Sequence, residues 1–140
     1  MKTWMSGTRG AILLVFLWVI GWGLGFGGLI EAFIDPDGKI MDIWVTAMVI
    51  PGFIGGAVFA AALSLAERRR FDEVPIIRFA FWGAFTGIVI GGIAFAKGIE
   101  LTLTTSKIFA ITTILGLIAG IGSAIFFRLV AWWTSAEIAA

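Results

Sequence analysis

Four long stretches of the chain carry no charged residue. Each is 18 to 24 residues long, and they cover residues 10–30, 43–66, 79–96 and 108–127. A helix needs about 20 apolar residues to cross the roughly 30 Å of hydrocarbon in a bilayer. No stretch shows the alternating segments of about ten residues that are typical of a membrane β-barrel. The pattern predicts an all-α integral membrane fold, a single domain over residues 1–140 with four transmembrane helices at about 10–34, 43–66, 78–97 and 108–133.

The connectors between these stretches are short. Asp35-Pro36-Asp37-Gly38 has the composition of a tight turn, because Pro fixes φ at the second position and Gly is free at the fourth. Residues 67–75 and 97–107 form the other two connectors. None of them is long enough to fold as a domain outside the membrane.

Basic residues gather on one side of the predicted membrane. That side has seven of the ten, including every arginine: Lys2, Arg9, Arg68, Arg69, Arg70, Arg78 and Arg128. Short loops rich in Lys and Arg stay in the cytoplasm. We therefore expect both termini in the cytoplasm of a multi-pass protein of the bacterial inner membrane, either cytoplasmic or intracytoplasmic.

Composition supports a membrane protein and narrows its chemistry. The chain is 60% hydrophobic and 14% charged, against about 25% charged residues in a soluble domain. It has no Cys and no His, which excludes disulfides, thiolate metal sites and imidazole chemistry. A net charge of +1 is too balanced for a nucleic-acid binder. No nucleophile–base pair, phosphate loop or metal-ligand spacing is present, so we expect neither catalytic nor metal-binding residues and no enzyme.

The two halves of the chain show a weak internal similarity. Trp22-Gly23-x3-Gly27 recurs as Trp82-Gly83-x3-Gly87, and the Gly52/Gly56 pair recurs as Gly116/Gly120. Two parallel hairpin repeats would explain this. The two tryptophans lie at different depths in their spans, however, and coincidence in a glycine-rich sequence explains it equally well.

Glycine is the most prominent small residue in the spans. Its i,i+4 pairs are Gly21/Gly25, Gly23/Gly27, Gly52/Gly56, Gly83/Gly87/Gly91 and Gly116/Gly120. In lipid such stripes let helix backbones approach closely, either within the chain or against a partner. Five glycines between positions 21 and 28 occupy more than one helical face. The first span is therefore our candidate for a glycine face left free for a partner protein, lipid or pigment.

Trp18 and Trp22 lie one turn apart on one face of the first span. A buried indole N–H needs a hydrogen-bond acceptor. A carbonyl group of a neighbouring helix is one candidate, and a bound lipid, quinone or tetrapyrrole is the other.

The second connector is the most distinctive polar segment. Its charged candidates are Glu67, Arg68, Arg69, Arg70 and Arg78. These residues either set the topology by contacting lipid headgroups or form a docking surface. In a docking surface, guanidinium groups would pair with carboxylates of a partner or with Asp72 and Glu73.

Residues 66–70 and 78–87 resemble the centre of an uncharacterised family of small four-span bacterial inner-membrane proteins. The shared pattern is Ala-Glu-Arg-Arg, a short loop, then Arg-x-Ala-x-Trp-Gly-Ala-x-x-Gly, which is found here from Ala66 to Gly87. The resemblance covers the second and third spans. It implies a bacterial inner-membrane protein and brings no catalytic residue with it.

These features favour a non-catalytic accessory subunit that packs against a larger integral membrane complex. Photosynthetic reaction-centre and light-harvesting antenna assemblies and respiratory complexes are the candidate classes. We expect no cofactor of its own, because the chain has no His to ligate bacteriochlorophyll. Contact with membrane lipid, or with quinone, carotenoid or bacteriochlorophyll held by partners, is open to it.

The alternative is a homo-oligomeric small channel or carrier for a neutral solute or ion. Its path would be lined by Thr and Gly, because the spans contain no charged residue near mid-membrane.

Overall fold

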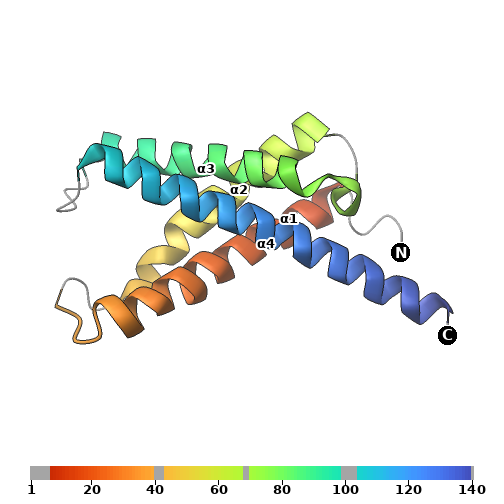
Figure 1. Cartoon of the computed structure of the whole chain (residues 1–140), viewed down its shortest axis with the longest axis horizontal. Coiled ribbons are helices and arrows are strands. Elements are labelled where there is room, and N and C mark those ends of the chain that lie inside the picture. The colour runs from red at the N-terminus through yellow and green to blue at the C-terminus, as the bar shows by residue number, and fades with distance from the viewer. Residues whose placement is uncertain (1–6, 40–42, 68–69, 99–103, 140) are drawn as a thin grey trace.

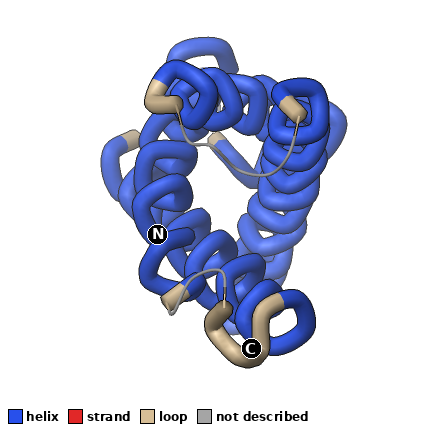
Figure 2. Tube along the Cα trace, turned by 90° about the vertical axis from the view of Figure 1, so that its left-hand side faces the viewer, coloured by secondary structure: helices blue, strands red, loops and turns tan. Residues whose placement is uncertain are grey.

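The computed structural model describes residues 7–39, 43–67, 70–98 and 104–139, which are helical apart from short turns (Figure 1). Four helical segments are long and apolar enough to cross a membrane: Thr8–Ile34, Trp44–Glu67, Ile76–Ala96 and Thr105–Ala139. The prediction of an all-α fold with four such helices is confirmed. Figure 2, viewed from the end of the molecule, shows no strand in the described part of the chain.

The first span is not a uniform α-helix. It begins as α1 (Thr8–Ile20) and continues as two π-helical segments, η1 (Gly21–Gly27) and η2 (Ile30–Ile34). In π-helical turns the hydrogen bond closes five residues apart, as when the Asp35 N–H donates to the Ile30 carbonyl at 2.9 Å. The sequence predicts an ordinary helix here, and the structure differs. In η1 four of the seven residues are glycine, so few side chains crowd the wider turns.

The other spans keep ordinary α-helical geometry. They are α2 (Trp44–Glu67), α3 (Ile76–Ala96) and α4 (Thr105–Ala139), with a short 3-10 turn, η3 (Phe71–Glu73), between α2 and α3. Helix α3 begins directly after Pro75, and α4 continues six residues beyond the predicted end at position 133. No Gly or Pro interrupts residues 134–139, so the helix continues although the apolar stretch has ended.

The turn predicted after the first span is present. The Gly38 N–H donates to the Asp35 carbonyl at 3.1 Å, and Gly38 has a φ of 62°. Asp35 is buried and accepts from the Trp44 indole N–H at 2.9 Å and from the Lys39 N–H at 2.8 Å. The carboxylate thereby ties the turn to the start of α2.

The four spans form two antiparallel hairpins that cross each other (Figure 1). The start of α1, the end of α4 and the η3 segment lie toward one end of the molecule, and the Asp35 turn lies at the other. The segments carrying Arg9, Arg70 and Arg78 therefore share one end, which we call the termini end.

A series of aromatic rings joins the hairpins where they cross. Trp18 of α1 packs on Phe59 of α2 with ring centroids 4.8 Å apart, and Phe59 packs on Phe79 of α3 at 5.9 Å. Phe79 in turn contacts Phe127 of α4 at 6.4 Å, and Phe127 contacts Phe71 at 5.4 Å. All five side chains are buried, so each helix contributes at least one ring to a common core.

Candidate functional site

Most of the predicted glycine stripes lie between helices of the same hairpin. An added Cβ would meet the backbone of the facing helix at Gly83, Gly87, Gly116 and Gly120. At Gly87, for example, the Cβ would lie 2.8 Å from Thr113 Cα. Gly91 faces the Thr112 Oγ1 at 2.7 Å. Only residues without a side chain allow α3 and α4 to approach this closely.

The first hairpin is packed in the same way. A Cβ at Gly27 would lie 2.8 Å from Val45 Cα, and one at Gly56 would lie 2.9 Å from Val15 Cα. Gly52 faces the backbone of α1 and Gly23 faces the Val49 side chain, at 3.0 Å in both cases. These four glycines hold the first span against α2.

Gly21 and Gly25 differ from these stripes, because no described residue of another segment opposes them. Within the part of the chain that the structure describes, no atom lies within 4 Å of the Cβ position at either residue, apart from atoms of the local helix. The same holds for Gly28. It lies three residues after Gly25 on the same helical face, so it is not part of an i,i+4 glycine pair. The first span thus has one glycine face against α2 and a second, which we call the open glycine face (Gly21, Gly25 and Gly28).

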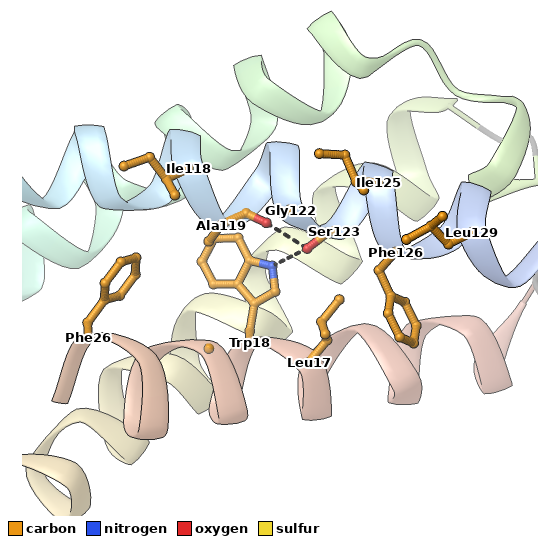
Figure 3. Close-up of a pocket in the computed structure, with 11 residues that line it drawn as sticks. Leu17, Trp18, Phe26, Ile118, Ala119, Gly122, Ser123, Ile125, Phe126 and Leu129 are labelled. Atoms are coloured by element: carbon orange, nitrogen blue, oxygen red, sulfur yellow. Dashed lines mark hydrogen bonds between the residues drawn. The ribbon is translucent and has the colours of Figure 1, made fainter. Parts of the chain in front are cut away.

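The two tryptophans of the first span have different surroundings. The Trp18 Nε1–H donates to Ser123 Oγ of α4 at 3.2 Å, and the Ser123 hydroxyl donates to the Ala119 carbonyl at 2.8 Å (Figure 3). Trp22 stacks on Trp18 with ring centroids 6.3 Å apart and is equally buried. Its Nε1 has no acceptor among the described residues. A neighbouring helix therefore satisfies Trp18, through a hydroxyl group instead of the carbonyl that we considered.

A hollow of about 390 Å³ lies beside this hydrogen bond, between α1 and α4 (Figure 3). Its walls are almost wholly apolar and include Leu17, Gly21, Phe26, Ile118 and Gly122. Gly122, like Gly21, has no atom of a neighbouring segment within 4 Å of its Cβ position. A second hollow of about 410 Å³ continues along α4 and ends at Trp133, Thr134 and Glu137. The described residues that line this second hollow all belong to α4. We call the two hollows together the α1–α4 groove, after the helices that line the first.

The charged motif in the second connector forms a clamp between α2 and α3. The Glu67 side chain is 5% exposed and accepts from Arg78 Nη1 at 3.0 and 3.2 Å. The Trp82 indole N–H also approaches it, at 3.4 Å. Three residues of the family-like pattern thus meet in space, which their separation in sequence does not show.

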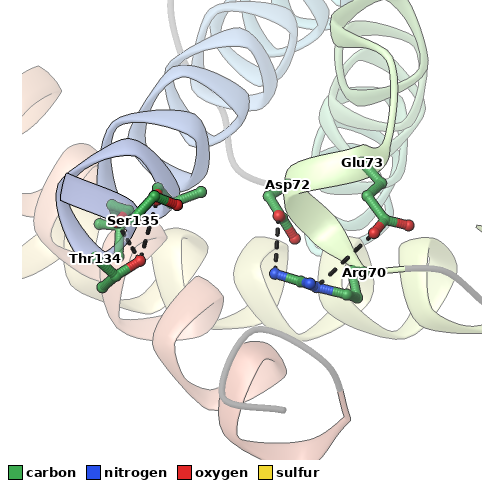
Figure 4. A network of polar contacts seen from close by, with 7 residues as sticks. Arg70, Asp72, Glu73, Thr134 and Ser135 are labelled. Atoms are coloured by element: carbon green, nitrogen blue, oxygen red, sulfur yellow. Dashed lines mark hydrogen bonds and ion pairs between the residues drawn. The ribbon is translucent and has the colours of Figure 1, made fainter. Parts of the chain in front are cut away.

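Arg70 is paired within its own connector (Figure 4). Its Nη2 lies 3.0 Å from the Asp72 carboxylate, and its Nε lies 4.0 Å from Glu73. This is the intrachain arrangement that we considered beside docking to a partner. Arg68 and Arg69 lie outside the described residues.

The hydroxyl groups within α3 and α4 bond to their own helices. Thr86 donates to the Trp82 carbonyl at 2.9 Å, Thr112 to Ile108 at 2.9 Å and Thr113 to Phe109 at 2.6 Å. Such bonds to the preceding turn satisfy a hydroxyl donor without a ligand. Within the described ranges, no group of three potential metal-ligating side chains occurs.

No family model, curated protein or solved structure matches the chain. The resemblance noted at residues 66–70 and 78–87 therefore stays a prediction.

Proposed function

We propose that this chain is a non-catalytic accessory subunit that docks its first span against a transmembrane helix of a larger integral membrane complex. The observation that carries the proposal is the open glycine face. The nine glycines of the other stripes each lie against another helix of the chain, whereas Gly21, Gly25 and Gly28 do not.

The physical argument concerns what glycine does in lipid. Glycine lowers helix stability by up to about 1 kcal/mol relative to alanine, and a glycine facing lipid gains no packing in return. Against another helix it allows close approach and dispersion contacts. The open face is bordered by Ile20, Leu24 and Leu29, which are each more than half exposed. A shallow furrow between large side chains is the shape that a ridge of a second helix fills.

We further propose that both termini lie in the cytoplasm of a bacterial inner membrane. The shared end of the segments carrying Arg9, Arg70 and Arg78 supports this orientation. The packing of the glycines supports a duplicated hairpin, because two glycine pairs hold each hairpin together. The pairs are Gly23/Gly27 and Gly52/Gly56 in the first hairpin, and Gly83/Gly87 and Gly116/Gly120 in the second.

Purification from native membranes in mild detergent tests the docking proposal. We expect the wild-type chain to co-purify with a fixed set of integral membrane subunits, and Gly25→Leu to lose that set. Gly92→Leu is the matched control, because Gly92 also has open space at its Cβ position but lies on α3. A wild-type chain that is monomeric and alone in mild detergent would overturn the proposal.

The alternative of a homo-oligomeric channel gains no support from its candidate lining residues. Thr86 is fully buried, and Gly87 lies against the backbone of α4. Both belong to the packing inside the second hairpin.

A further inference from the structure

The α1–α4 groove is continuous and follows one helix. Phe126 and Leu129 line both of its hollows, and it extends from Ile118 to Glu137. At about 1.5 Å per residue this distance is roughly 28 Å. The groove therefore runs from the middle of α4 to its C-terminal turns, at the termini end.

The first hollow has a length that suits one acyl chain. It covers the stretch of α4 from Ile118 to Leu129, roughly 17 Å, which is close to the hydrocarbon depth of one leaflet at about 15 Å.

The two hollows differ in polarity. In the first, the polar atoms of Trp18 and Ser123 already bond to each other, so its walls suit hydrocarbon. The second ends at Trp133, Thr134 and Glu137. An occupant with an apolar tail and a polar head would match both parts.

The polar end has the chemistry of a cation site. Glu137 forms no ion pair with a described residue and is exposed. Trp133 lies one turn before it and exposes 67% of its surface. The Thr134 hydroxyl donates to the Val130 carbonyl at 3.0 Å, which leaves its oxygen free to accept. A carboxylate, an indole face and a hydroxyl oxygen together favour an ammonium group and disfavour an anionic head.

We propose that the α1–α4 groove binds one acyl chain of an aminophospholipid, with the lipid ammonium group against Glu137 and Trp133. Charge complementarity selects this lipid over an anionic one. The bound lipid would border the open glycine face at Gly21. Lipid binding is measured on the isolated chain, so its test does not depend on partner docking.

Native mass spectrometry of the purified chain tests this proposal. The chain is reconstituted in nanodiscs with equal phosphatidylethanolamine and phosphatidylglycerol of identical acyl chains, then released in mild detergent. We expect one retained phosphatidylethanolamine per chain, favoured about fivefold over phosphatidylglycerol. Glu137→Gln should bring the ratio close to one, and its exposed position leaves the fold unaffected.

The acyl-chain part is tested separately. Gly122→Leu should fill the first hollow and lower retention of both lipids, whereas Gly92→Leu, with equally open space outside the groove, should leave retention unchanged. Equal retention of the two lipids by the wild type would overturn the proposal, as would a preference that survives Glu137→Gln. Unchanged lipid retention in a folded Gly122→Leu variant would also overturn the proposal. So would a wild-type chain that is released as a dimer without bound lipid.

Discussion

Helix α4 faces α3 on one side and α1 on the other, and the two contacts differ sharply. Toward α3, Gly116 and Gly120 lie directly against a neighbouring backbone. Toward α1, Gly122 faces open space, and the main polar link is the Trp18–Ser123 hydrogen bond. Glycines a few residues apart on one helix thus differ in their surroundings: two pack against a neighbouring helix and one does not. The role of a glycine in a membrane helix can be assigned only when the surface opposite it is known.

The largest expected effect comes from adding a side chain at the close contact between α3 and α4. Gly87→Ala should lower the free energy of unfolding by about 3 kcal/mol, because its Cβ would meet the α4 backbone. SDS titration followed by circular dichroism measures this. Gly92→Ala, on the same helix with open space, should leave stability unchanged or raise it by up to about 1 kcal/mol. Equal losses in both variants would contradict the distinction.

The connector clamp gives the next effect. Glu67→Ala should lower the free energy of unfolding by about 2 kcal/mol, because it removes a buried carboxylate that Arg78 and Trp82 both contact. The same titration applies. Glu73→Ala is the control, since Glu73 is 57% exposed and lies 4.0 Å from Arg70; it should change stability by less than about 0.5 kcal/mol. A Glu67 variant as stable as the Glu73 variant would show that the clamp adds nothing.

Loss of the hydrogen bond between α1 and α4 should lower the free energy of unfolding less than the two changes above. Ser123→Ala leaves the Trp18 N–H without its acceptor and should cost about 1 kcal/mol. Unfolding in SDS, read by tryptophan fluorescence, gives the value. Ser135→Ala, whose exposed hydroxyl bonds to the Ala131 carbonyl of its own helix, should behave as wild type. If both serine variants match wild type, the Trp18 bond does not stabilise the α1–α4 contact.

The smallest effect is expected at the open glycine face. Gly25→Leu should change the free energy of unfolding of the isolated chain by less than about 0.5 kcal/mol, since none of the described residues of another segment opposes Gly25. SDS titration of the purified variant checks this. A large loss would mean that the face is used inside the chain, and the docking proposal would lose its basis.

The sequence predicted the spans well because apolar length is a local property. Four uncharged stretches and the Asp35 turn were enough to place four helices. Their ends were less accurate: α4 continues to Ala139 because helix propensity outlasts the apolar stretch. The π-helical segments were missed, since nothing in the spacing of glycines distinguishes a wide turn from an ordinary one.

The site was predictable only in part. Glycine spacing pointed to the first span as the one with a surplus face, but assigning each stripe to a neighbour required the fold. Trp18 and Ser123 are 105 residues apart, so no local pattern could pair them. Glu67, Arg78 and Trp82 stood out through the family resemblance, yet their mutual contacts depend on how α2 and α3 meet. The partner complex stays a prediction.

Helix length has one last consequence for this protein. At about 1.5 Å per residue, the 35 residues of α4 form a rod of roughly 52 Å, whereas the 21 residues of α3 measure roughly 32 Å. A bilayer thick enough for α3 leaves about 20 Å of α4 to tilt or to emerge from the hydrocarbon. The tilt of α4, and with it the depth at which its last turns lie, therefore depends on the thickness of the bilayer.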